Sequence, residues 1–180
     1  MRIAFTTALF LILSVQISAA ETPWETYLAM PTPENASRVV SITYSPGSSR
    51  TAGSLDYLDR LLLNQQIRSG DAEAYLLAIR ITRTTDSAAG LEDLNASIGG
   101  SIRANPAVFL SVAKRASLTE AELRRIVFMT GEPYVDRADA KRLELKLRRE
   151  AIASVDDSTF RDIRALCLAI LDVRLGKHSK

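Results

Sequence analysis

Three pairs of neighbouring carboxylates are the residues of this 180-residue chain best suited to acid–base chemistry. They are Glu120 and Glu122, Asp136 and Asp139, and Asp156 and Asp157. Two carboxylates about 5–10 Å apart in a cleft can hydrolyse a glycosidic bond. Each pair, however, stands where a helix is predicted to begin, and acids are favoured there because free backbone N–H groups and the helix dipole stabilise them. We therefore interpret the pairs as helix caps and keep a carboxylate-dependent cell-wall hydrolase only as a third hypothesis.

The chain has one cysteine, Cys167, and one histidine, His178. Cys167 lies in the apolar stretch 165–171, which predicts a small buried hydrophobic side chain. A Ser-His-Asp triad needs a histidine held between two partners, and zinc sites need several His or Cys ligands. The glycine-rich loops that bind phosphates are absent from the sequence. We therefore expect no catalytic residue, no metal site and no cofactor, and hence a protein that is not an enzyme.

The first 20 residues have the pattern of a secretory signal peptide. Arg2 precedes an apolar run over 3–17, and Ser18-Ala19-Ala20 supplies the small residues of a cleavage site. A retained membrane anchor is the alternative, although a spanning helix needs roughly 20 apolar residues. Loss of Arg2 leaves 22 Lys and Arg against 21 Asp and Glu, a balance that predicts no nucleic-acid partner. We expect an exported protein, periplasmic or secreted, without a transmembrane segment after cleavage.

The remaining chain must supply the elements that position any site, and its apolar residues recur at the i, i+3, i+4, i+7 spacing of amphipathic helices. The N-terminal part, residues 21–44, is predicted to form two short helices, followed by a flexible polar loop at 45–54. A helical body over 55–176 and a disordered tail at 177–180 complete the chain. The helices expected in the body cover residues 54–70, 71–82, 87–104, 105–116, 119–131, 136–155 and 157–175.

Helices of about 11–20 residues with short connections predict an all-α fold built from antiparallel helix pairs. Successive pairs indicate an α-solenoid, similar in style to HEAT-type helical pairs, or an orthogonal helical array. A compact helical bundle is the alternative architecture.

Two groups of residues are candidates for binding a partner. Arg142, Lys146 and Arg149 share one face of the predicted helix 136–155 and form a basic surface for an acidic partner or anionic lipid head groups. The alternative is a solvated helix with internal ion pairs. Trp24 and Tyr27 form either an exposed interface pair or an anchor that packs the N-terminal segment on the body.

Gly99 and Gly100 interrupt a helical pattern, and each glycine costs roughly 1 kcal/mol relative to alanine inside a helix. Either a neighbouring helix approaches closely at this point, or a kink opens a groove there. A groove near Gly99 and Gly100 would suit the second functional hypothesis, a protein that binds a small ligand or a lipid.

The favoured hypothesis is a non-catalytic interaction or scaffold protein of the cell envelope. Stacked helices form extended concave surfaces, which suit the binding of another protein. We therefore expect a protein partner, whose identity and stoichiometry the sequence does not specify.

Overall fold

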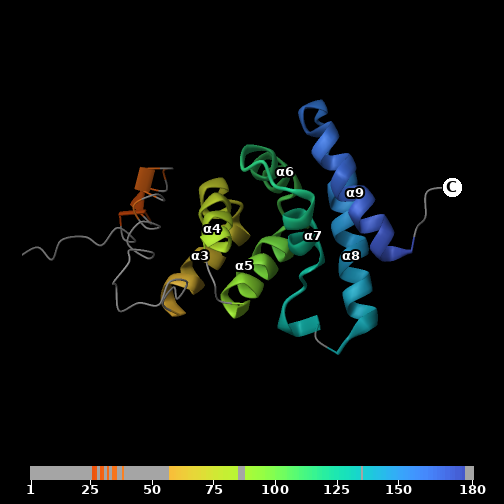
Figure 1. Ribbon diagram of the computed structural model, residues 1–180, viewed down its shortest axis with the longest axis horizontal. Helices are drawn as coiled ribbons and strands as arrows, with labels where there is room; N and C mark the ends of the chain where they lie inside the picture. Colours follow the sequence, from red (N-terminus) through yellow and green to blue (C-terminus); the bar gives the residue numbers. More distant parts are fainter. Residues whose placement is uncertain are drawn as a thin grey trace, which may run out of the picture.

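The computed structural model describes residues 26, 27, 29, 30, 32, 34, 35, 38, 57–84, 88–134 and 136–176. Every regular element among these residues is a helix, which confirms the predicted all-α class. The helices follow one another across the molecule in chain order, from α3 on one side to α9 on the other (Figure 1). None of the helices in these ranges is long and apolar enough to cross a bilayer.

Several sequence predictions lie outside the described residues. They concern the signal peptide at 1–20, Trp24, the loop at 45–54 and the tail at 177–180.

The helices of the body agree closely with the predicted ranges. They are α3 (Tyr57–Ser69), α4 (Ala72–Thr84), α5 (Ala88–Ser101), α6 (Pro106–Arg115), α7 (Glu120–Phe128), α8 (Ala138–Ala153) and α9 (Arg161–Leu175). Two short 3₁₀ turns, η1 (Glu132–Tyr134) and η2 (Ser158–Phe160), precede α8 and α9.

Side chains cap helix starts at three places. Asp71 accepts hydrogen bonds from the backbone N–H groups of Glu73 (2.8 Å) and Ala74 (3.2 Å) at the start of α4. Thr119 and Glu122 form a reciprocal capping box at the start of α7. Asp157 accepts from a backbone N–H in η2, one turn before α9. These local hydrogen bonds satisfy N–H groups that a helix start leaves free.

The sequence pattern places Asp136 at the start of the sixth helix of the body, and this prediction is wrong. The φ of Asp136, +62°, lies in the left-handed region, whereas an N-cap residue normally adopts extended backbone. The helix α8 instead begins after Arg137, whose side chain makes no capping hydrogen bond. The preceding turn η1 sets this geometry, because the N–H of Arg137 donates to the carbonyl of Tyr134 at 3.3 Å.

Packing connects each helix to the second one after it in the chain. The helices α3, α5, α7 and α9 contact one another in that order, and α4, α6 and α8 form a second series. The most extensive contact joins α8 to α9. A hydrogen bond between the Tyr75 and Ser101 hydroxyls ties α4 to α5 inside the core. One continuous apolar core therefore runs through the described body.

Candidate functional site

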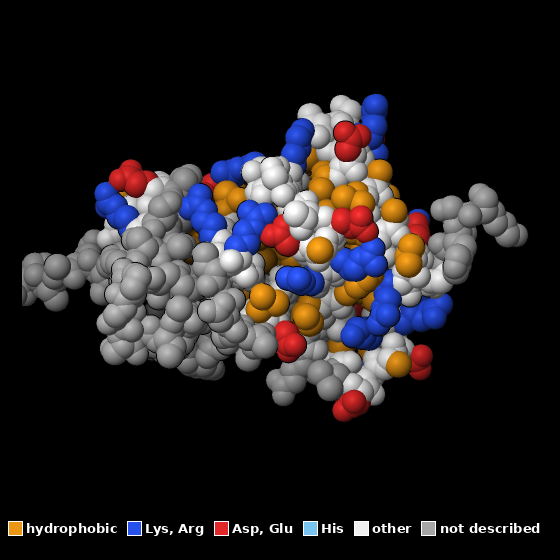
Figure 2. All heavy atoms as spheres, viewed as in Figure 1, with side chains coloured by type: hydrophobic (Ala, Val, Ile, Leu, Met, Phe, Trp, Pro, Cys, Tyr) orange, Lys and Arg blue, Asp and Glu red, His pale blue; other side chains and the backbone are white. Residues whose placement is uncertain are grey.

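A large depression lies over α7, and we call it the α7 groove. It has a volume of about 620 Å³ and is open to solvent. Its lining consists of Glu120, Ala121, Arg124, Arg125, Phe128, Met129 and Lys141. Figure 2 shows hydrophobic side chains interspersed with Lys and Arg side chains over the part of the molecule that holds α7 to α9. The groove therefore combines an apolar floor with a basic rim.

Helical periodicity explains why α7 presents this surface. Leu123, Ile126 and Val127 are buried against the core, so they fix the rotation of the helix. Ala121 and Phe128, seven residues apart, then fall together on another face, because this spacing completes about two turns. The groove was not among the sites predicted from the sequence. The sequence feature that could have indicated the groove is the apolar pair Ala121 and Phe128, which lies on the face opposite the buried residues.

The rim of the α7 groove carries uncompensated positive charge. Arg124 pairs with Glu120 at 2.6 Å, whereas Arg125 and Lys141 make no ion pair with the described residues. The guanidinium of Arg174, from α9, lies 5.7 Å from the centre of the Phe128 ring, within the range of a cation–π contact. Ligands with negative charge are therefore favoured at this rim.

A second depression adjoins the groove beyond Met129 and Lys141. It measures about 280 Å³, and both of these residues line it as well. Glu92 and Asp93 of α5 line this second depression, so acidic side chains adjoin the basic ones of the α7 groove. A partner segment longer than the α7 groove would meet these acidic side chains.

A buried arginine supports the floor of the groove from below. Arg148 is 1% exposed, and its Nη1 donates to the carbonyls of Val127 (3.0 Å) and Met129 (2.9 Å). Its Nε donates to Glu144 Oε1 at 3.0 Å. Burial lowers the pKa of Arg148 and Glu144 opposes that shift, yet an arginine keeps its proton in a protein. A cation thus lies at the C-terminal end of α7, where the helix dipole favours it.

The carboxylate of Glu144 collects three donors in the same cluster. Besides Arg148, Arg103 donates to Oε2 at 3.0 Å, and the Tyr134 hydroxyl lies 3.4 Å from the same oxygen. Glu144 itself is almost fully buried. This cluster connects the turn after α5, η1 and α8 beneath the groove.

Gly99 makes the cluster sterically feasible. A Cβ at this position would lie 2.5 Å from the carbonyl oxygen of Ile126, 2.7 Å from Arg148 Nη1 and 2.9 Å from the carbonyl oxygen of Met129. The helix α5 therefore approaches α7 closely here, one of the two interpretations considered for the glycine pair. Gly100 faces open space, with no atom within 4 Å of the place where a Cβ would stand.

The predicted basic face of α8 is largely engaged with α9. Arg149 forms two hydrogen bonds with the carboxylate of Asp172, at 2.6 and 3.0 Å, and this contact raises the pKa of the arginine. Arg142 donates to the carbonyl of Leu175 at 3.2 Å, at the C-terminal end of α9. Lys146 is exposed and makes no ion pair with the described residues. Two of the three predicted binding residues thus hold α8 against α9.

Two further residues singled out from the sequence, Tyr27 and Cys167, are buried and do not line the α7 groove. Tyr27 is fully buried, and burial, followed by the charges of Asp71 and Glu73, raises the pKa of its hydroxyl. This position is typical of an anchor for the N-terminal segment. Cys167 is buried as predicted, and burial raises the pKa of its thiol to about 12, so the reactive thiolate is disfavoured.

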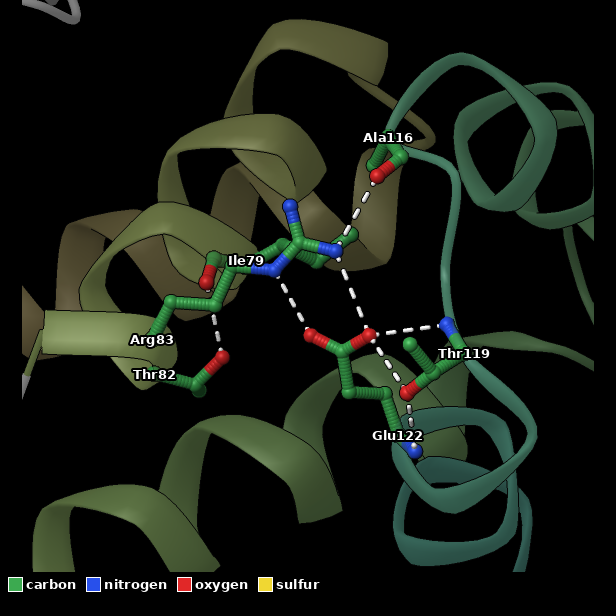
Figure 3. Close-up of polar contacts among 6 residues, drawn as sticks. All are labelled: Ile79, Thr82, Arg83, Ala116, Thr119 and Glu122. Atoms are coloured by element: carbon green, nitrogen blue, oxygen red, sulfur yellow. Dashed lines mark hydrogen bonds and ion pairs between the residues drawn. The ribbon is translucent and has the colours of Figure 1, made fainter.

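An exposed ion pair joins α4 to the start of α7 (Figure 3). Arg83 donates through Nε to Glu122 Oε1 at 2.6 Å and through Nη2 to Oε2 at 3.2 Å and to the carbonyl of Ala116 at 3.0 Å. Thr119 donates to the same carboxylate through its backbone N–H and its hydroxyl, both at 2.8 Å. The hydrogen bonds from Arg83, then those from Thr119, lower the pKa of Glu122 to about 2.

The low pKa of Glu122 predicts an acid-sensitive contribution to stability. Because the folded-state pKa lies below the ordinary value of 4.5, ionised Glu122 stabilises the fold above that pH and loses the effect as the pH falls towards 2. We expect Glu122→Gln to cost about 1–2 kcal/mol near neutral pH, a figure reduced for the partial exposure of the pair. Glutamine retains the capping-box geometry, so the variant isolates the charge.

Urea unfolding at a series of pH values tests this prediction. The difference in unfolding free energy between the wild type and Glu122→Gln should shrink steadily below about pH 4.5. Glu120→Gln serves as the control, since its ion pair with Arg124 is exposed on both sides and should contribute at most about 0.5 kcal/mol. A difference that stays constant down to the lowest pH would contradict the assignment.

Comparisons of the chain with protein-family models, with curated proteins and with solved structures gave no match. The function of the site is therefore inferred from the geometry and charge of its own residues. No group of three or more His, Cys, Asp or Glu side chains in the described part of the chain is arranged to hold a metal ion.

Proposed function

We propose that this protein is a non-catalytic interaction module whose α7 groove binds an acidic segment of a partner protein through an apolar anchor residue. The observation that carries the proposal is the combination of Phe128 and Met129 on the floor with Arg125 and Lys141 at the rim. Apolar anchors that fill a pocket supply most of the energy of a protein interface, and charges at the rim select the partner and guide its approach.

The size of the groove suits a short segment of a partner. Its volume of about 620 Å³ lies within the usual range for ligand sites, about 300–1,000 Å³, and it is open rather than enclosed. An open surface admits a continuous chain that enters at one end and leaves at the other. The adjoining acidic depression would accept a basic residue at one end of such a segment.

We also propose a solenoid-like arrangement of antiparallel helix pairs, in the manner of HEAT-type repeats. The two series of alternate contacts, through α3, α5, α7 and α9 and through α4, α6 and α8, support two layers of helices. Such layers expose a broad binding surface on one side. An orthogonal array or a compact bundle is the alternative, and small-angle X-ray scattering separates an elongated solenoid from a compact bundle.

Export to the periplasm or the exterior completes the proposal. The pattern of residues 1–20 supports it, since a basic start, an apolar run and small residues are what a signal peptidase recognises. The predicted N-terminus of the exported chain can be read by mass spectrometry of the protein from its native cell.

Selection from a phage-displayed library of random peptides tests the groove. We expect the purified protein to enrich peptides in which Asp and Glu surround a large apolar residue. The double variant Arg125→Glu/Lys141→Glu should weaken binding of the selected peptides at least about tenfold, about 1.4 kcal/mol.

A second charge reversal on α8 provides the matched control. Lys146→Glu reverses one charge at an exposed position outside the groove, and it should leave peptide binding unchanged. Melting temperatures of both variants verify that they fold. Loss of binding in Lys146→Glu alone would instead assign the site to the basic face of α8, and failure to enrich acidic peptides would overturn the proposal.

A further inference from the structure

A third and smaller depression, a cavity among α4, α5 and α7, is not accounted for by the proposed function. Its volume is about 170 Å³, and we call it the α4–α7 cavity. Its polar lining consists of Thr82, Arg83, Asn95, Glu122 and Arg125. The rest of its wall is aliphatic, and Ile79 and Ile126 are members of the buried core.

Asn95 is the feature of this cavity that points to a ligand. The residue is 4% exposed and lines the cavity, and its side-chain amide makes no hydrogen bond with the described residues. Asn95 is not among the described residues that have a fully enclosed polar atom without a partner, so its amide is accessible from the cavity that it lines. A molecule in the cavity can therefore accept a hydrogen bond from this amide.

The charges around the cavity favour a single negative charge. Arg83 and Glu122 neutralise each other through their paired hydrogen bonds. Arg125 contributes the remaining charge, since it makes no ion pair with the described residues. A guanidinium and an amide N–H₂ group are the donors that a carboxylate accepts.

The volume and the aliphatic wall limit what can bind. A water molecule takes about 30 Å³ in the liquid, so the cavity exceeds the space of one water and admits a small organic molecule. Leu91 and Leu118 would contact an aliphatic tail of a few carbons.

We propose that the α4–α7 cavity binds a short-chain aliphatic carboxylate. The ligand carboxylate accepts from the Asn95 amide and pairs with Arg125, and its tail lies against the aliphatic wall. This site is separate from the partner interaction proposed above, although Arg125 lines both the cavity and the α7 groove. A ligand that recruits Arg125 would therefore change the charge that the groove presents.

Nuclear magnetic resonance of the wild-type protein with propionate as the probe tests this site directly. We expect saturable shifts of the Asn95 side-chain amide and of the Ile126 methyl groups at millimolar propionate. Chloride at the same ionic strength and propionamide, which has the same shape without the charge, should leave these signals in place. Equal responses to all three probes, or no saturable shift, would overturn the proposal. Such a result would show that the cavity holds water and does not bind a carboxylate.

Asn95→Leu provides a second readout by removing the amide while keeping the bulk of the side chain. We expect at least about a tenfold loss of propionate affinity in this variant, with peptide binding in the groove unchanged. Lys141→Glu is the reciprocal control, since this residue lines the groove and does not line the cavity. The two proposals can therefore fail independently.

Discussion

Replacing Arg148 with methionine is expected to destabilise the fold by about 3–5 kcal/mol, the largest effect of any single substitution that we predict. Methionine fills much of the same space but supplies no donor. The carbonyls of Val127 and Met129 would lose their partner, and Glu144 would keep only its contacts with Arg103 and Tyr134. A buried carboxylate with reduced compensation accounts for most of the loss.

The neighbouring arginine provides a matched control for this prediction. Arg149→Met removes a guanidinium from the next residue of the same helix, but the ion pair that it breaks, with Asp172, is partly exposed. We expect a loss of about 1 kcal/mol. Urea unfolding of both variants measures the two free energies.

The double variant Glu144→Leu/Arg148→Met separates the lost ion pair from the lost packing. It removes both buried charges, so it should recover part of the stability that Arg148→Met loses. The two unpaired carbonyls remain, and recovery should therefore be incomplete. Equal stability of Arg148→Met and Arg149→Met would show that the buried cluster does not hold α7 as we describe.

Alanine substitutions at Gly99 and Gly100 are expected to change stability in opposite directions. At Gly99 the new Cβ would lie 2.5 Å from the carbonyl oxygen of Ile126, a backbone atom that cannot move without shifting α7. We expect a loss of about 2–3 kcal/mol, since overpacking exceeds the gain in helix propensity. At Gly100 the methyl group meets open space, so the propensity gain of about 0.5–1 kcal/mol should appear.

Thermal and urea unfolding of the two alanine variants decides between these effects. The comparison is internally controlled, because the two positions are adjacent in α5 and the chemical change is identical. A stabilised Gly99→Ala protein would contradict the close approach of α5 to α7, and a strongly destabilised Gly100→Ala protein would show that a contact covers this face of the helix.

Local patterns predicted the helices and most of their ends. Asp71 and Thr119 cap helices through backbone groups two or three residues away, so the information lies within one turn of sequence. Gly70 and Gly176 end helices with φ values of +87° and +72°, which glycine adopts without the steric cost of a Cβ. Asp136 departs from its predicted role because a preceding turn, not its own side chain, sets its backbone.

The candidate site was less predictable because its interactions connect residues far apart in the chain. Arg149 and Arg142 look free on a helical projection, yet they bind Asp172 and the carbonyl of Leu175, 23 and 33 residues away. The sequence shows that Gly99 lowers the stability of its helix relative to alanine. It does not show that Arg148 occupies the space that a side chain at this position would need. Spacing within one helix carries no information on such partners.

The central proposal, that the α7 groove binds a partner protein, is tested most directly by photo-cross-linking in the native cell. A photoreactive phenylalanine analogue replaces Met129 in the groove or, as the control, Lys146 on the exposed face of α8. We expect one cross-linked product from position 129, joined to an acidic segment of its partner and lost when Arg125→Glu and Lys141→Glu are added. A product from position 146 without one from position 129, or a product from position 129 that survives the charge reversal, would contradict the proposal.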